Sequence, residues 1–259
     1  MNLYDFTLDL IKAAGQQLEA RKKETFSVSS KNDDPKNIVT SLDIEIGQYI
    51  TDRILAEYPD HSVYSEEAND IVGNNYQWVI DPIDGSAVFS RGIPQYAISI
   101  GVLKDGVPIV GAVLDPMTGE LFSFKQGEGA FLNGEIIKVS AQTELKSCFV
   151  LLAAGRKEDQ REWAGESYKR LLGTVNKTKN FGSSALSLCY IAAGRIEGVV
   201  AGTLTTKDIV AAIGILNEAG GMVTDNAGAP ALFLQTPQRI YAANNEVVST
   251  RLRALLELK

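Results

Sequence analysis

The chain has 259 residues, of which 45% are hydrophobic and 22% are charged, a composition typical of a soluble globular protein with a sizeable core. Its formal net charge of -7 disfavours nucleic acid and anionic membrane surfaces as partners. No apolar run reaches the roughly 18 residues of a membrane span, and the first residues lack the basic segment of a secretion signal. We therefore expect a cytoplasmic protein with no nucleic-acid or membrane partner.

The first half is expected to begin with two helices. Apolar residues at helical spacing predict a helix over residues 3–22. A second helix is expected to start near Thr40, where Thr40-Ser41-Leu42-Asp43 fits a capping box. Asp43 is therefore either only a helix cap or also part of a site.

A mostly antiparallel sheet is expected between residues 97 and 140. Strands are predicted at 98–103 and 107–114, joined at Asp105-Gly106, and a further hairpin turn is predicted at Asn133-Gly134. The first half, residues 1–142, is therefore expected to be an α+β unit.

Beyond residue 145, helices and strands alternate. Ser183 or Ser184 is expected to cap a helix that stops at Gly194, and Asp208 is expected to begin another that ends at Gly220. The remaining predicted elements are strands at 196–201, 222–224 and 240–242 and a helix at 247–258. Residues 143–259 therefore form a predicted α/β half, either closely joined to the first half or part of one compact unit with it.

Cysteine and histidine chemistry has little support. Cys148 and Cys189 stand far apart in apolar surroundings, so we expect reduced core thiols rather than a disulfide. His61 is the single histidine, which excludes a zinc site with two histidines and leaves little room for a Ser-His-Asp triad. We expect His61 to lie in a turn.

The segment 78–86, Trp-Val-Ile-Asp-Pro-Ile-Asp-Gly-Ser, is typical of a strand that delivers carboxylates to a turn. Pro82 has no N–H for a ladder and Gly85 permits a positive φ, so the chain is predicted to leave the sheet at Asp81. Two carboxylates about 4 Å apart repel by roughly 4 kcal/mol at an effective dielectric of 20, so a close pair needs a proton or a cation. Oxygen ligands favour magnesium, manganese or calcium, although Asp81 and Asp84 also fit a plain turn.

Glu66 and Glu67 follow a short predicted strand end at Val63 and Tyr64. Neighbours on a strand point to opposite faces, so the two glutamates are expected to have different roles. A solvated loop is the alternative.

These acids and Ser86, in their order and context, resemble the inositol monophosphatase family of metal-dependent, lithium-sensitive phosphatases over nearly the whole chain. The strongest motifs are residues 78–86 and 208–221, and weaker ones are residues 39–43, 182–185 and 242–245. The resemblance implies a layered αβαβα sandwich, intermediate between α+β and α/β, in a protein that commonly forms a homodimer.

The resemblance also implies the roles of individual residues. The expected cofactor is two or three Mg²⁺ ions, or Mn²⁺, with Asp81 bridging two of them, and the expected metal ligands are Glu66, Asp81, the carbonyl of Ile83, Asp84 and Asp208. Ser86 and Asp43 would orient and deprotonate the attacking water, and Glu67 would polarise a metal-bound water.

Substrate contacts are expected from two segments. Backbone N–H groups of Gly85, Ser86 and Ala87 would hold phosphate oxygens. The rest of the substrate would contact the helix start formed by Gly182, Ser183 and Ser184. A loop containing Lys31 and Lys36 is expected near the metals, and either lysine could approach the site.

Lys207, Val88 and Ala201 depart from the family pattern, which has tryptophan, asparagine and a substrate-binding glutamate at these positions. None of these changes removes an expected metal ligand, but they weaken the case for inositol phosphate itself. Fructose 1,6-bisphosphate, histidinol phosphate and 3′-phosphoadenosine 5′-phosphate are therefore alternative substrates of the expected phosphomonoesterase. A non-catalytic metal-binding regulatory protein is the alternative of another class.

Other phosphate and metal templates fit poorly. An EF-hand loop starting at Asp81 would need glutamate where Gly92 stands, and aspartyl-nucleophile phosphatases separate their acids by one residue rather than two. The chain also lacks the Gly-x-x-x-x-Gly-Lys loop of nucleoside triphosphatases.

Overall fold

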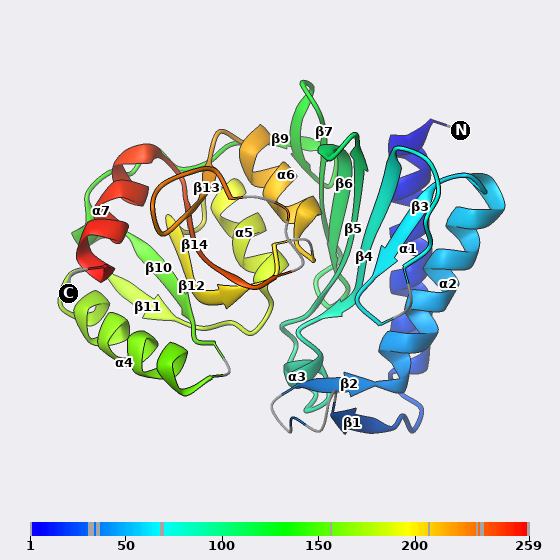
Figure 1. Ribbon diagram of the computed structural model, residues 1–259, viewed down its shortest axis with the longest axis horizontal. Helices are drawn as coiled ribbons and strands as arrows, with labels where there is room; N and C mark the ends of the chain where they lie inside the picture. Colours follow the sequence, from blue (N-terminus) through cyan, green and yellow to red (C-terminus); the bar gives the residue numbers. More distant parts are fainter. Residues whose placement is uncertain are drawn as a thin grey trace.

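The computed structural model describes residues 2–30, 34, 37–67, 70–155, 157–206, 208–231, 233 and 236–257. Helices α1 (Leu3–Arg21) and α2 (Ser41–Glu57) cover the outer face of a 7-stranded sheet, and α5 (Ser184–Ala192) and α6 (Val210–Glu218) lie between that sheet and a 5-stranded one (Figure 1). Helices α4 (Glu158–Leu172) and α7 (Glu246–Leu256) cover the far side. The predicted layered αβαβα fold is confirmed.

The first sheet follows chain order and is antiparallel except where β3 pairs with β4. Its strands are β3 (Ser62–Ser65), β4 (Tyr76–Asp84), β5 (Ala97–Lys104), β6 (Val107–Asp115), β7 (Glu120–Lys125), β8 (Gly129–Leu132) and β9 (Glu135–Ile137). Both predicted hairpins are confirmed. Asp105 and Gly106 have φ of 51° and 79°, and Asn133 and Gly134 have φ of 50° and 87°, the left-handed pairs that twist-matched hairpins require.

The second sheet has the order β11-β10-β12-β14-β13. Its strands are β10 (Phe149–Ala153), β11 (Lys177–Lys179), β12 (Gly198–Leu204), β13 (Met222–Asp225) and β14 (Gln238–Ala243). The predicted strand at 196–201 is displaced toward the carboxyl terminus, because β12 takes its register from β10 and β14. The helix predicted from Asp208 begins at Val210, since the N–H groups of Asp208 and Ile209 bond to Thr205 and Thr206 in a preceding turn.

The remaining elements are short, and three of them lie near the carboxyl end of β4. Strands β1 (Val28–Ser30) and β2 (Ile38–Thr40) form an antiparallel pair, and α3 (Ser86–Phe89) follows β4 directly. A 3-10 turn, η2 (Leu145–Ser147), precedes β10.

The middle helices pack onto both sheets, so one core spans the predicted halves. Phe122 and Phe124 of β7 lie in the same buried cluster as residues of α5, α6 and β12. The close approach of α6 to β6 depends on Gly111 of β6, where a Cβ would lie 2.7 Å from the Phe124 ring and 2.9 Å from Ala211. The division at residue 142 stays a prediction.

Two smaller predictions concern cysteines and membranes. Cys148 and Cys189 are buried and free, as expected. Within the described ranges, no helix combines the length and apolarity needed to cross a membrane.

His61 lies in a bend, as predicted, but it also carries a packing role. Its ring stacks between Tyr58 and Tyr76, with centroid distances of 4.7 Å to each, and its Nδ1 accepts a 2.9 Å hydrogen bond from Trp78 Nε1. An accepting Nδ1 requires the neutral ring, with the proton on Nε2. Burial lowers the pKa of His61, and the nearby Asp60 opposes that shift only in part.

This arrangement predicts a pH-dependent contribution of His61 to stability. The unfolded chain takes up a proton at the ordinary histidine pKa, near 6.5, whereas the folded chain does so only at lower pH. The stabilisation is therefore present above about pH 6.5 and is lost as the pH falls below it. The free energy of unfolding of wild type and of His61→Gln should be measured by denaturant unfolding from pH 5 to pH 8. The difference between the two proteins should decrease toward low pH. A difference that stays constant would contradict a neutral His61 in the folded chain.

Candidate active site

A bulge at the carboxyl end of β4 positions the central acids. Asp81 pairs with Ser99, and pairing with β5 resumes at Asp84 opposite Ala97 after a register shift. The strand therefore continues beyond Asp81, and the prediction that the chain leaves the sheet there is wrong. Pro82 lies in the bulge, where no ladder N–H is needed, and Ile83 N donates to Asp81 Oδ1 at 3.1 Å.

Acids from separate segments of the chain raise the pKa of Asp81. Burial, followed by repulsion from Glu66, Asp84 and Asp208, raises the pKa of Asp81 well above its ordinary value. Glu66 is held at the end of β3 by its N–H, which donates to Ile80 O at 3.2 Å. Tyr64, two residues earlier on β3, donates its hydroxyl to Asp208 Oδ1 at 3.1 Å. These acids line one cavity.

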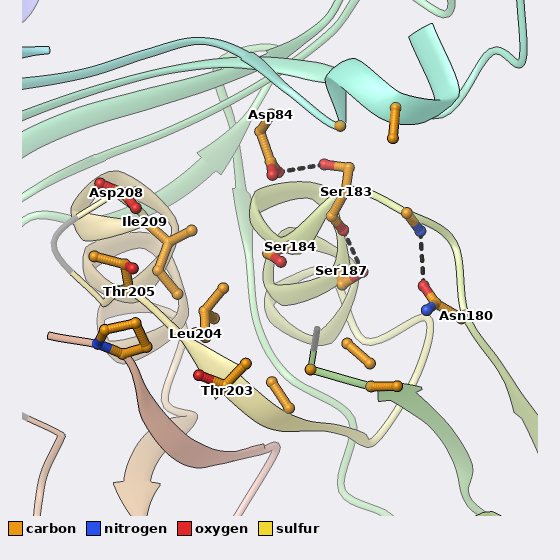
Figure 2. A pocket seen from close by; sticks show the side chains of 18 of the residues that line it. Asp84, Asn180, Ser183, Ser184, Ser187, Thr203, Leu204, Thr205, Asp208 and Ile209 are labelled. Atoms are coloured by element: carbon orange, nitrogen blue, oxygen red, sulfur yellow. Dashed lines mark hydrogen bonds between the residues drawn. The ribbon is translucent and has the colours of Figure 1, made fainter. Parts of the chain in front are cut away.

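Asp84 connects β4 to the start of α5. Its Oδ2 accepts a hydrogen bond from Ser183 Oγ at 2.5 Å (Figure 2). It accepts a second one from Ala185 N at 2.6 Å. Ser183 Oγ also accepts from Leu186 N and so caps α5, which confirms the first of the two predicted caps. Burial raises the pKa of Asp84, while the hydrogen bonds from Ser183 and the helix N–H groups oppose the rise. The Ser183 hydroxyl therefore holds a carboxylate of the site in place.

Ser86 and Asp43 form a direct hydrogen bond at the beginning of α3. Gly85 has φ of 104°, and after this turn Ser86 Oγ lies 2.6 Å from Asp43 Oδ1 and 2.9 Å from Ile83 O. One hydroxyl proton serves one acceptor at a time, and the shorter contact is to the carboxylate. Ser86 is thus oriented by a buried acid.

Asp43 is also a helix cap. Its Oδ2 accepts from Thr40 N at 2.8 Å and from Thr40 Oγ1 at 2.5 Å, which completes the predicted capping box of α2. Burial raises the pKa of Asp43, and the hydrogen bonds from Ser86 and Thr40 act against that rise. The predicted capping role is confirmed. Because Oδ2 caps α2 while Oδ1 contacts Ser86, the cap is compatible with a role of Asp43 in the site, which stays a prediction.

The cavity has a volume of about 890 Å³ and collects most of the predicted residues. Those lining it are Glu66, Asp81, Ile83, Asp84, Asp208, Gly85, Ser86, Ala87, Gly182, Ser183 and Ser184. Asp43 reaches it through Ser86. Glu67 is half-buried in the turn after β3 and is not among the described lining residues. Lys31, Lys36 and Lys207 lie outside the described residues.

The far walls contain residues that sequence reasoning missed. Thr203, Leu204 and Thr205 lie along one side of the cavity, at and beyond the end of β12 (Figure 2). Lys157 and Arg161 line it from the start of α4. Among the missed residues that contact predicted ones, Tyr64 carried a usable signal, since it stands two positions before Glu66 and so shares its strand face.

The donor set fits a magnesium ion in its chemistry. In the described part of the chain, no three acidic, histidine or cysteine side chains are gathered closely enough to hold a metal ion as they stand. The donors are nevertheless carboxylate and carbonyl oxygens, the ligands that magnesium prefers, and the repulsion on buried Asp81 is the kind that a cation relieves.

Comparison with known proteins finds relatives named as a phosphatase and as a Nus factor. It is 33% identical over 228 residues to the "fructose-1,6-bisphosphatase/inositol-1-monophosphatase" of Thermotoga maritima, covering 88% of this chain and 86% of the relative. It is 34% identical over 223 residues to the "Nus factor SuhB" of Vibrio cholerae, covering 84% and 82%.

Solved structures share the whole fold. The extragenic suppressor protein suhB of Bartonella henselae superposes with a TM-score of 0.91 at 29% identity, covering 98% of this chain and 97% of the other. The inositol-monophosphate-bound SaIMPase-II, from Staphylococcus aureus, superposes with a TM-score of 0.82 at 27% identity, covering 99% and 94%. Residues 2–258 match the inositol monophosphatase family. This chain, with its acids gathered at the bulge of β4 and its Ser86–Asp43 pair, belongs to the inositol monophosphatase family.

Proposed function

We propose that the protein is a magnesium-dependent phosphomonoesterase that hydrolyses a small phosphorylated metabolite by in-line attack of water. The observation that carries the proposal is the 2.6 Å hydrogen bond between Ser86 Oγ and Asp43 Oδ1, beside the buried acids of β4. Membership of a phosphatase family supports the reaction class. Dependence on two or three Mg²⁺ or Mn²⁺ ions, inhibition by lithium, a homodimer and a cytoplasmic location belong to the same proposal.

The metal ions would be held by the oxygen donors around the bulge: Glu66, Asp81, the carbonyl of Ile83, Asp84 and Asp208. When bound, they would neutralise phosphate charge and lower the pKa of water, as paired ions do in phosphoryl-transfer sites. Asp84 would be kept in place by Ser183 and Ala185 N, since these donors fix its carboxylate against α5.

Ser86 and Asp43 would handle the proton of the attacking water. Thr40 holds Asp43 so that Oδ1 faces Ser86, and the Ser86 oxygen can accept a proton from water while its own proton passes to Asp43. The water oxygen would then bond to phosphorus as the bond from phosphorus to the alcohol oxygen breaks, and the departing alcohol oxygen would take up a proton from solvent. Backbone N–H groups of Gly85, Ser86 and Ala87 would donate to the phosphate oxygens, with Glu67 acting from outside the cavity lining.

The proposed substrate class is supported by the names and bound ligands of the relatives. Solved structures of SaIMPase-II hold inositol monophosphate and 2′-AMP, and the Thermotoga maritima relative is named for two phosphatase activities. A small phosphorylated metabolite is therefore the proposed ligand, with the remaining contacts made by Gly182, Ser183 and Ser184.

The second candidate is a non-catalytic regulatory protein that retains the metal site. Its support is the relative named Nus factor SuhB. Phosphate release should be measured with magnesium on inositol phosphates, sugar phosphates and bisphosphates, histidinol phosphate and nucleotide phosphates. The enzyme predicts turnover of at least one compound, whereas metal binding without release from any compound would favour the regulatory protein.

Ser86→Ala is expected to lower kcat by at least about a hundredfold, because a positioned proton acceptor contributes about that much or more. Ser86→Thr should retain most activity, since it keeps the hydroxyl that faces Asp43. The matched control is Ser90→Ala in the same turn of chain, where the hydroxyl donates to Ala87 O. Equal kcat in Ser86→Ala and Ser90→Ala would refute the assigned role.

Asp84→Asn is expected to lower turnover by at least about a hundredfold through a weakened metal site. The amide oxygen can still accept from Ser183 and Ala185 N, but the negative charge is lost. Asp105→Asn is the control, because asparagine tolerates the left-handed turn at that hairpin. Steady-state kinetics should be measured together with the affinity for manganese. Wild-type turnover in Asp84→Asn would contradict the proposal that Asp84 is a metal ligand.

A further inference from the structure

Asp208 reaches the cavity from the second sheet, whereas the other acids proposed as metal ligands belong to the first. Pairing with neighbouring strands fixes the main chain at Glu66, Asp81 and Asp84. Asp208 lies in the turn between β12 and α6, ahead of the first residue of that helix (Figure 2). Its N–H donates to Thr205 O at 3.2 Å, a bond within the turn itself. The place of Asp208 beside the first sheet therefore depends on contacts between distant segments.

Tyr64 connects the first sheet to this turn. It is paired on β3 with Val79 of β4, and its hydroxyl donates to Asp208 Oδ1 at 3.1 Å, a contact that spans 144 residues. Glu66 stands two positions later, and its N–H continues the strand pairing by donating to Ile80 O. One short strand therefore leads to one proposed metal ligand and donates a hydrogen bond to another.

Apolar packing sets the direction of the Tyr64 side chain. The ring packs against a small buried cluster formed by Val79, Leu103 and Val210, the first residue of α6. Val210 lies close to β5, since a Cβ added at Gly101 would lie 2.9 Å from its Cγ1. The ring and the start of α6 thus meet at one interface, which brings the hydroxyl to the turn that precedes the helix.

A second hydrogen bond holds this turn from the side of β14. Gln238 Nε2 donates to Thr206 Oγ1 at 2.9 Å, and Thr206 is fully buried. That bond acts on Thr206 and not on the carboxylate two residues later. An aspartate carboxylate can rotate about two side-chain bonds, so its direction depends on the groups that bind it. The Tyr64 hydroxyl supplies such a group from the first sheet.

The Tyr64 hydroxyl is suited to act as a donor. A tyrosine hydroxyl keeps its proton at neutral pH, and burial together with the charge of Asp208 raises the pKa of Tyr64 further. An ionised carboxylate has no proton to give, so the hydroxyl is the donor of this pair. Tyr64 is not among the described residues that line the cavity, so an effect on the site would pass through Asp208.

We propose that Tyr64 is a positioning residue of the metal site, whose hydroxyl orients the carboxylate of Asp208 so that acids from both sheets can hold the same cations. This inference rests on the proposed function, in which Asp208 is a metal ligand. Loss of a group that orients a metal ligand typically lowers metal affinity by roughly 10- to 100-fold.

Tyr64→Phe tests the hydroxyl while keeping the ring against Val79 and Val210. Manganese should be titrated into the full chain, with unbound Mn²⁺ measured by electron paramagnetic resonance. At least one ion should bind about tenfold more weakly than in wild type. The magnesium concentration for half-maximal activity should rise by about the same factor, and saturating magnesium should restore kcat to within about twofold of wild type.

The matched control is Tyr4→Phe. It removes another part-buried tyrosine hydroxyl, which lies 2.9 Å from Ser123 Oγ on the α1 side of the first sheet and outside the described cavity lining. Tyr4→Phe should leave manganese affinity and magnesium dependence unchanged. The free energy of unfolding of both variants, measured with denaturant, separates a loss of stability from a loss of metal binding.

A double-mutant cycle shows whether Tyr64 acts through Asp208. In an Asp208→Ala background, Tyr64→Phe should change the remaining manganese affinity by less than about twofold, because the carboxylate that the hydroxyl orients is absent. Equal losses of affinity in the two backgrounds would show that Tyr64 acts independently of Asp208 and would overturn the proposal.

Unchanged manganese affinity in Tyr64→Phe would also overturn it, because a lower stability alone indicates only a packing role. Failure of the proposed function gives a different result. Wild type would then bind Mn²⁺ and Tyr64→Phe would bind it more weakly, without phosphate release from any compound tested. A wild type that binds no Mn²⁺ would overturn both proposals.

Discussion

The burial of Asp81 among other acids is the constraint on which the site depends. Asp81 is 5% exposed, and the charged groups found to raise its pKa, among the described residues, are the acids Glu66, Asp84, Asp208 and Asp43. Carboxylates about 4 Å apart repel by roughly 4 kcal/mol at an effective dielectric of 20, so such a group is stable only with protons or a cation. The surrounding fold supplies the rigidity that keeps these acids together.

That rigidity comes from elements that are distant in the sequence. Asp84 on the first sheet is held by the cap of α5, and α5 and α6 are packed between the two sheets in one buried cluster. A change in how α5 and α6 pack would therefore move the donors that hold Asp84 and the turn that carries Asp208.

Local features could be predicted from the sequence, and contacts between distant segments could not. The capping box of Thr40 and Asp43 and the hairpin at Asp105-Gly106 depend on neighbouring residues and were predicted from pattern alone. The Ser86–Asp43 contact spans 43 residues, and only the family resemblance linked these two positions in advance. The Asp84–Ser183 contact spans 99 residues and depends on helix packing, so no local signal pointed to it. Continuation of β4 past Asp81 depends on pairing with β5, which explains why a strand end was expected there.

On this proposal, Asp81 lies at the centre of a cation site. Manganese binding to the full chain, followed by electron paramagnetic resonance, tests it without requiring a substrate. More than one Mn²⁺ is expected to bind per wild-type chain, with magnetic coupling between nearby ions, and that coupling should be lost in Asp81→Asn but not in Asp105→Asn. Binding and coupling that are the same in Asp81→Asn as in wild type would contradict it.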